Sequence, residues 1–120
     1  MTASFSIKRR LKSFQYAAKG IAHLVASQHN AWIHLVATVL VVCFGFYCQL
    51  SASDWSLIVV AITMVWTTEA INTAIELLCD FATSDRHSLI EKTKDLAAGA
   101  VLIAAIGAAA IAILVFYPYL

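Results

Sequence analysis

Hydrophobic and polar positions divide the chain into four segments that each favour a helix. Residues from about 5 to 27 carry apolar side chains at three- and four-residue steps, which predicts an amphipathic helix. Three further stretches, about 31–49, 55–79 and 96–117, are almost continuously apolar and about as long as a bilayer core requires. We therefore predict an all-α integral membrane protein with three transmembrane helices plus an N-terminal amphipathic surface helix, forming one domain over residues 1–120.

The composition agrees with a membrane protein. Of the 120 residues, 62% are hydrophobic and only 12% are charged, a balance far from that of a soluble domain. A charged side chain that faces lipid costs about 2.5–3.5 kcal/mol on insertion scales, so such residues usually face a bundle interior or a wet cavity and mark function. His34, inside the first apolar stretch, is expected to pack or to form a hydrogen bond rather than to bind a ligand.

Basic residues gather in two places along the chain. Five precede the first apolar stretch and three lie between the second and the third, whereas the connection around 49–54 has none. Because cytoplasmic segments are enriched in Lys and Arg, we predict a cytoplasmic N-terminus, a cytoplasmic loop over residues 81–95 and an outer C-terminus. The basic N-terminal helix is predicted to lie along the inner leaflet, with its cations toward the lipid head groups.

The second apolar stretch ends in polar residues with helical spacing. At about 100° per residue, these residues fall within an arc of roughly 100°. We call this set the polar stripe: Glu69, Asn72, Thr73, Glu76 and Asp80. One alternative is that its acids simply lie shallow enough to reach water.

Carboxylates beside lysines and arginines at a membrane surface suggest a metal-bound phosphate. Mg²⁺ takes oxygen ligands, often one or two carboxylates with phosphate oxygens and water. Phosphoryl transfer needs positioning, charge compensation and a group that accepts the proton of the acceptor hydroxyl. The chain has no glycine-rich phosphate-binding loop, so a nucleotide site here would be built differently. Ion or proton transport would use similar residues, and the pattern alone leaves both possibilities open.

Two sequence runs carry a resemblance to a known family. Glu69-Ala-Ile-Asn-Thr-Ala-Ile-Glu76 with Asp80, followed by Lys94-Asp95-Leu-Ala-Ala-Gly-Ala-Val-Leu, resembles the signature of the prokaryotic diacylglycerol kinases, a family that includes the undecaprenol kinases. The resemblance implies a homotrimer in the bacterial plasma (inner) membrane, with active sites shared between subunits. It implies transfer of the γ-phosphate of Mg-ATP to a lipid hydroxyl. The expected partners are the lipid, ATP and the membrane, and no nucleic acid.

The resemblance also implies roles for individual residues. Glu69 would be the general base, and Asn72 would position the reacting groups. Glu76 would bind Mg²⁺ together with Gln28, which stands where the family usually has a second metal-binding glutamate; its amide oxygen can bind a metal but brings no charge. The implied nucleotide-binding residues are Arg9, Lys12, Tyr16, Asp80, Lys94 and Asp95.

The acceptor lipid is left open between diacylglycerol, which would give phosphatidic acid, and undecaprenol, which would give undecaprenyl phosphate. The run Asn30-Ala-Trp-Ile-His34 resembles the undecaprenol kinases more closely. The alternative function is a non-enzymatic small membrane assembly, either an ion-conducting oligomer or an inactive kinase relative. A pore would place polar residues along most of a span, whereas the polar stripe is confined to one end of the second span, which favours the kinase.

Overall fold

The computed structural model describes residues 4–120, so the first three residues of the predicted 1–120 domain lie outside it. The chain forms α1 (Ile7–Ser27), α2 (His29–Cys48), α3 (Ala52–Ala82), α4 (Ser88–Phe116) and a short 3₁₀ helix, η1 (Tyr117–Tyr119). Three segments, α2, α3 and α4 with η1, are long and apolar enough to cross a membrane. The all-α prediction with three candidate spans is confirmed.

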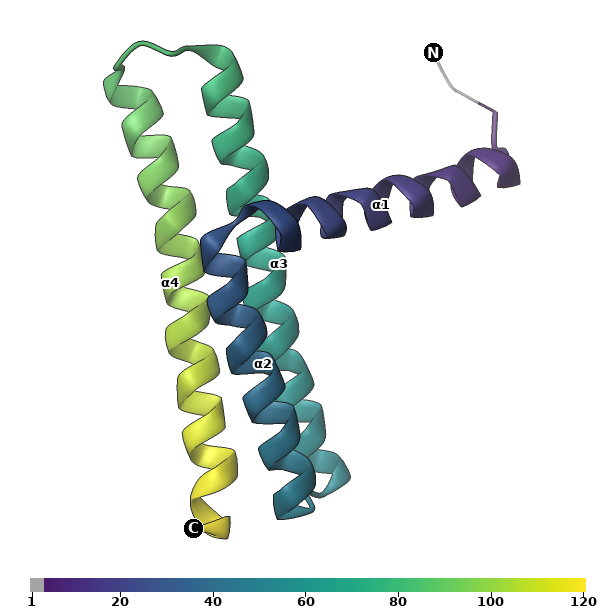
Figure 1. The fold of residues 1–120 in the computed structure, drawn as a ribbon, viewed down its shortest axis with the longest axis vertical. Helices are drawn as coiled ribbons and strands as arrows, with labels where there is room; N and C mark the ends of the chain where they lie inside the picture. Colours follow the sequence, from purple (N-terminus) through teal and green to yellow (C-terminus); the bar gives the residue numbers. More distant parts are fainter. Residues whose placement is uncertain (1–3) are drawn as a thin grey trace.

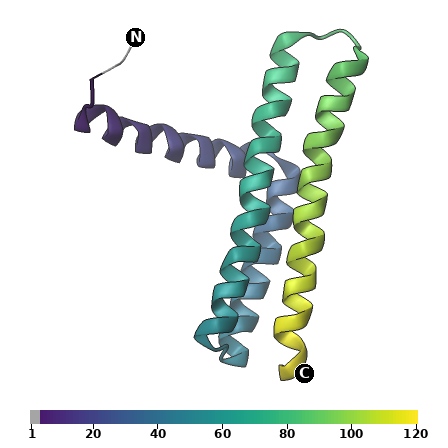
Figure 2. The same ribbon diagram turned by 180° about the vertical axis from the view of Figure 1, so that it is seen from behind.

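The three long helices lie side by side as a bundle, and α1 projects away from it (Figures 1 and 2). The chain changes direction at Gln28, whose extended backbone (φ −112°, ψ 124°) ends α1 and begins α2. Leu24 is buried near this junction, whereas most of α1 is exposed, including its apolar residues Phe14 and Ile21. The position of α1 along the membrane surface stays a prediction.

The predicted loop over residues 81–95 is wrong in its extent. The α3 helix continues to Ala82 and α4 begins at Ser88, so the connection covers only residues 83–87. The His87 side chain caps α4 by accepting a hydrogen bond from the backbone N–H of Leu89 at 3.1 Å. Polar residues can continue a helix beyond the bilayer, so the change in hydropathy marks a membrane boundary and not a helix end. The α3–α4 hairpin therefore extends past the junction of α1 and α2 (Figure 1).

The most extensive helix contact joins α3 to α4. Small buried residues on α4, Ala97 and Ala104, allow the close backbone approach that stabilises helix pairs in lipid. On α3 most of the buried residues share one face, at three- and four-residue steps: Ile58, Ala61, Val65, Glu69, Asn72 and Thr73; Cys79 is buried as well. One face of α3 thus buries apolar side chains along its first half and polar side chains along its second half.

The opposite end of the bundle is held by a separate set of contacts. The side chains of Leu50, Ile58, Val115 and Phe116 form a buried cluster. Gly45 lies so close to Trp55 that a Cβ atom there would meet the indole Cη2 at 2.6 Å, so the absence of a side chain permits this approach. The bundle therefore has a packed apolar end far from the polar stripe.

Candidate active site

The polar stripe runs from the interior of the bundle to the exposed end of the hairpin. Glu69 is buried, with only 1% of its surface exposed, and Asn72 and Thr73 are buried beside it. Glu76 is half-buried and Asp80 is exposed. The alternative in which these acids simply reach water does not hold for Glu69, which must be stabilised by groups inside the bundle.

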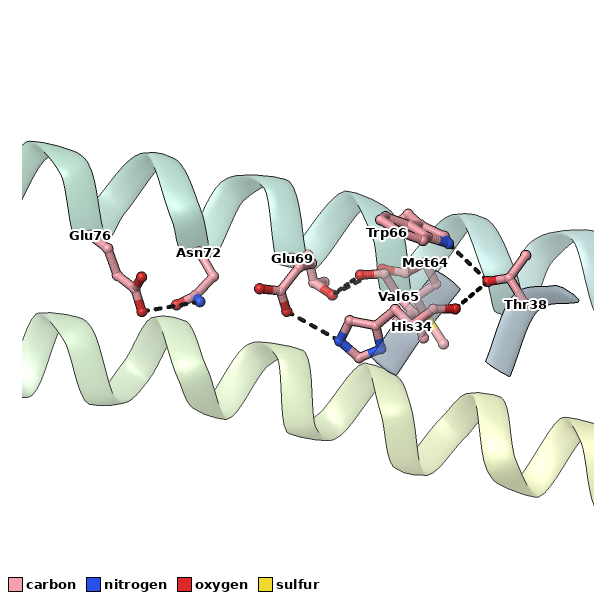
Figure 3. A network of polar contacts seen from close by, with 9 residues as sticks. His34, Thr38, Met64, Val65, Trp66, Glu69, Asn72 and Glu76 are labelled. Atoms are coloured by element: carbon pink, nitrogen blue, oxygen red, sulfur yellow. Dashed lines mark hydrogen bonds and ion pairs between the residues drawn. The ribbon is translucent and has the colours of Figure 1, made fainter. Parts of the chain in front are cut away.

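A histidine from α2 provides that stabilisation. His34 Nε2 lies 3.2 Å from Glu69 Oε2, and the His34 side chain is 17% exposed. Figure 3 shows Glu76, Asn72 and Glu69 in a row along the space between α3 and α4, with His34 at the end of the row. The expectation that His34 forms a hydrogen bond is confirmed, and its partner is the most deeply buried carboxylate of the polar stripe.

Further contacts join α2 to α3 around His34. Trp66 Nε1 donates to Thr38 Oγ1 at 3.0 Å, and Thr38 Oγ1 donates to the backbone oxygen of His34 at 2.6 Å. The Trp66 ring stands edge-on to the His34 ring, with the ring centroids 6.2 Å apart. Hydrogen bonds between helices replace the water that a bilayer core lacks, so this network fixes α2 against α3 beside Glu69.

Two polar atoms of the stripe have no partner among residues 4–120. Asn72 Nδ2 donates to Glu76 Oε1 at 3.4 Å, which leaves Asn72 Oδ1 buried and unpaired, and Thr73 Oγ1 is unpaired as well. A buried polar atom without a partner costs about 1–3 kcal/mol. This cost favours a site that is completed by a bound group.

The available donor set suits a hard cation such as Mg²⁺. The unpaired amide oxygen of Asn72 and the carboxylate of Glu76 are oxygen ligands, which Mg²⁺ prefers, and Mg²⁺ usually keeps several waters or phosphate oxygens. Within residues 4–120, no group of three His, Cys, Asp or Glu side chains could hold a metal ion. A Mg²⁺ ion at the stripe would therefore complete its shell with water and phosphate.

An ion pair joins the two helices near the end of the hairpin. Lys94 Nζ donates to Asp80 Oδ1 at 2.7 Å, and the two side chains are 40% and 65% exposed. Exposed pairs of this kind are weak because water screens them, so Lys94 can exchange Asp80 for a phosphate at little cost. The pair borders a hollow of about 340 Å³ at the end of the hairpin.

The other implied nucleotide-binding residues lie elsewhere in a single chain. Asp95 stands about 200° around α4 from the buried Ala97 and borders a shallow groove on the outside of the bundle. Arg9, Lys12 and Tyr16 are exposed on the projecting α1. One copy of the chain does not bring these four residues to the polar stripe.

The implied metal ligand Gln28 lies between α1 and α2. It is half-buried, and its side chain makes no capping hydrogen bond to the start of α2. The amide therefore has no structural task at the helix start that would prevent it from binding a ligand.

An apolar cavity of about 220 Å³ adjoins His34 between the three long helices. Its polar lining comes from His34 and Thr38, and the remainder is apolar, including Val41, Ile58 and the small residue Ala108. His34 therefore lies between an apolar space on one side and the carboxylate of Glu69 on the other.

The comparison with known families decides the class of this protein. Residues 15–116 match the family model described as prokaryotic diacylglycerol kinase. The chain belongs to the prokaryotic diacylglycerol kinase family. The resemblance seen in the sequence is thus confirmed, and the protein is a lipid kinase rather than an ion-conducting oligomer.

Individual relatives of this lipid kinase support the same class. It is 36% identical over 114 residues to an undecaprenol kinase from Bacillus subtilis, covering 95% of this chain and 93% of that protein. It is 36% identical over 99 residues to a diacylglycerol kinase from Synechocystis, covering 82% of this chain and 57% of that protein. A diacylglycerol kinase from Helicobacter pylori is 28% identical over 108 residues, covering 84% of each chain.

The structure of the kinase places three residues beside the site that the sequence analysis did not include in it. His34 contacts Glu69, and Trp66 and Thr38 hold His34. The sequence signal for this contact was a polar side chain inside each of two apolar stretches, His34 in 31–49 and Glu69 in 55–79. That signal does not say which two side chains meet, because the pairing depends on how α2 packs against α3.

Proposed function

We propose that the kinase transfers the γ-phosphate of Mg-ATP to the hydroxyl of a membrane lipid, either diacylglycerol or undecaprenol. The observation that carries this proposal is the position of Glu69. Its buried carboxylate has an apolar cavity and His34 on one side, and Asn72 and Glu76 on the other. A lipid alcohol arriving from the bilayer and a phosphate arriving from water would meet at this point.

In the proposed reaction, Glu69 accepts the proton of the lipid hydroxyl. The hydroxyl oxygen forms a bond to the γ-phosphorus as the bond from that phosphorus to the bridging oxygen of ADP breaks, and ADP leaves with the electron pair. General base catalysis of this kind contributes about 10²–10⁴-fold to the rate. Asn72 lies one helical turn from Glu69 and positions the reacting groups.

Glu76 and Gln28 are the proposed Mg²⁺ ligands. The ion neutralises charge on the phosphates when it is bound. The half-buried Glu76 carboxylate and the unpaired oxygen of the adjacent Asn72 give this part of α3 the donors that Mg²⁺ requires. Glu76 provides the negative charge, and Gln28 provides a neutral oxygen.

The nucleotide is proposed to bind along the end of the hairpin. At about 1.5 Å per residue, α3 continues for about 20 Å from Glu69 to its end at Ala82. Asp80 lies on this extension and Lys94 on the facing part of α4, next to the hollow at the end of the hairpin. The hairpin carries them away from the apolar part of the bundle, so a nucleotide dissolved in water can reach them.

We propose a homotrimer with active sites shared between subunits. Arg9, Lys12 and Tyr16 point away with α1, and Asp95 lies on the outside of α4. A site that includes these residues must therefore take some of them from a neighbouring copy. The exposed apolar faces of the bundle helices suit contact with lipid or with other copies.

The proposed location is the bacterial inner membrane, with the hairpin on the cytoplasmic side. The basic residues of α1 and of the hairpin lie toward one end of the bundle, and the connection between α2 and α3 has no Lys or Arg. By the positive-inside rule, the N-terminus and residues 83–87 are cytoplasmic and the C-terminus is outside.

A transfer assay tests the proposed function. Purified protein in lipid bilayers would receive Mg-ATP with diacylglycerol or undecaprenol, offered separately, and the phosphorylated lipid would be measured. We expect transfer to lipid, faster with undecaprenol because the Asn30–His34 run resembles the undecaprenol kinases. Reactions with excess chelator should give no product. If neither lipid is phosphorylated at saturating Mg²⁺, the proposal is wrong.

The substitution Gln28→Glu tests the metal assignment. A second carboxylate at the metal would attract Mg²⁺ more strongly than a neutral amide, so half-maximal activity should need about tenfold less Mg²⁺. The measurement is the Mg²⁺ dependence of the initial rate at saturating lipid. His29→Glu is the matched control, since it adds the same charge one residue away. Unchanged Mg²⁺ dependence in Gln28→Glu would place this residue away from the metal.

A further inference from the structure

His34 is the partner of Glu69 that the proposed roles leave unused. It comes from α2, whereas Glu69, Asn72 and Glu76 all come from α3. The distance of 3.2 Å between His34 Nε2 and Glu69 Oε2 is that of a hydrogen bond. Among residues 4–120 it is the side-chain polar contact that the structure gives Glu69, which is otherwise enclosed by the bundle.

The direction of this hydrogen bond follows from the chemistry of the two groups. A carboxylate that is ready to accept a proton is ionised, and an ionised carboxylate only accepts hydrogen bonds. His34 Nε2 must therefore carry the hydrogen and donate it to Glu69 Oε2. The bond occupies one carboxylate oxygen and leaves the other for the lipid hydroxyl.

The His34 side chain has a second neighbour on α3 besides Glu69. The backbone oxygen of His34 accepts from Thr38, which accepts from Trp66, and the Trp66 ring packs edge-on to the imidazole. The Trp66–Thr38 bond keeps this part of α2 against α3, and the edge-on Trp66 ring limits where the imidazole can lie beside Glu69. A glutamate side chain has three rotatable bonds, and a hydrogen bond to a fixed donor selects one of its orientations.

We propose that His34 is a positioning residue that holds the carboxylate of Glu69 toward the acceptor hydroxyl, at the boundary between the apolar cavity and the polar stripe. This inference rests on the proposed function, in which Glu69 is the base. His34 does not touch the phosphate or the lipid oxygen in this role. Its effect on the rate passes through the orientation of Glu69, and a misplacement of about 1 Å at a reacting group can cost about 100-fold.

The test compares His34→Ala with His34→Gln in the lipid transfer assay. His34→Ala removes the donor, and we expect kcat to fall about 100-fold. The KM for Mg-ATP should change by less than about threefold, because the proposed nucleotide site is on the other side of Glu69. His34→Gln keeps a side-chain N–H donor of similar reach, and it should recover at least about tenfold of that loss. Recovery by the amide separates hydrogen-bond donation from simple filling of space.

A second comparison asks whether the effect passes through Glu69. Glu69→Asp draws the carboxylate back by one methylene group, beyond reach of His34. If His34 acts through Glu69, adding His34→Ala to Glu69→Asp should lower kcat by less than about threefold, since coupled residues are not additive. A full further loss of about 100-fold in the double variant would overturn the inference.

Tyr119→Phe is the matched control for loss of an interhelical side-chain hydrogen bond. Tyr119 donates to Asp54 at 2.9 Å at the opposite end of the bundle, and loss of its hydroxyl should leave kcat within about twofold of the wild-type value.

Equal losses in His34→Ala and His34→Gln, or an unchanged kcat in His34→Ala, would also overturn the inference. In each case an active wild-type protein would leave the proposed lipid kinase reaction intact, whereas an inactive wild-type protein would overturn both.

Discussion

Glu69→Gln is expected to lower turnover about a thousandfold while Mg-ATP still binds. The amide has nearly the same size as the carboxylate and can accept the hydrogen bond from His34 through its oxygen. It cannot take a proton from the lipid hydroxyl, and loss of a general base costs about 10²–10⁴-fold. The measurements are kcat in the lipid transfer assay and the affinity for Mg-ATP by calorimetry.

The control for Glu69→Gln is the equivalent change in an acid outside the proposed site. Asp54 lies at the start of α3, at the opposite end of the bundle, where it accepts a hydrogen bond from Tyr119. Asp54→Asn should therefore retain nearly full turnover. Full activity in Glu69→Gln would remove this residue from the role of base, and a parallel loss of nucleotide binding would instead assign Glu69 to the nucleotide site.

Glu76→Gln is expected to lower the rate about 100-fold at Mg²⁺ concentrations that saturate the wild-type protein. Gln28 is neutral, so Glu76 provides the negative charge of the proposed ligand pair. Its loss weakens metal binding, and a 100-fold lower rate corresponds to about 2.7 kcal/mol of lost stabilisation. The affected quantity is the Mg²⁺ dependence of kcat, and raising Mg²⁺ should recover part of the activity.

Two comparisons make the Glu76 prediction specific. Recovery by Mg²⁺ should occur in Glu76→Gln and be absent in Glu69→Gln, because only the first variant weakens metal binding. Combining Gln28→Glu with Glu76→Gln should restore part of the lost Mg²⁺ affinity by returning one carboxylate to the site. A Glu76→Gln protein with wild-type Mg²⁺ dependence would show that Glu76 does not bind the metal.

The polar stripe illustrates what periodicity can predict. The angle between residues on a helix depends only on local backbone geometry, so the common face of Glu69, Asn72 and Glu76 follows from their spacing. Their burial also follows in part, because an acid inside an apolar stretch must avoid lipid. The structure confirms both inferences, with Glu69 and Asn72 buried and Glu76 half-buried.

The hairpin shows where hydropathy misleads. The second apolar stretch ends near residue 79, yet α3 continues to Ala82. The third apolar stretch begins near residue 96, yet α4 already begins at Ser88. Hydropathy reports which residues can lie in a bilayer, whereas the helix end depends on caps such as His87 and on packing between α3 and α4. Lys94 therefore lies on a helix, where it can reach Asp80, and the neighbouring Asp95 points elsewhere.

The sequence by itself determined the family, the all-helical fold with three candidate spans and the face of α3 that carries the polar stripe. The family follows from the resemblance of two sequence runs to a known signature, and the other two depend on composition or on spacing within one segment; all of them can be observed without knowing how segments meet. Only the tertiary structure decided that His34 contacts Glu69, that Lys94 pairs with Asp80, and that α1 carries Arg9 and Lys12 away from its own bundle. These contacts depend on the rotation and register of one helix against another, which arise from packing along whole helices.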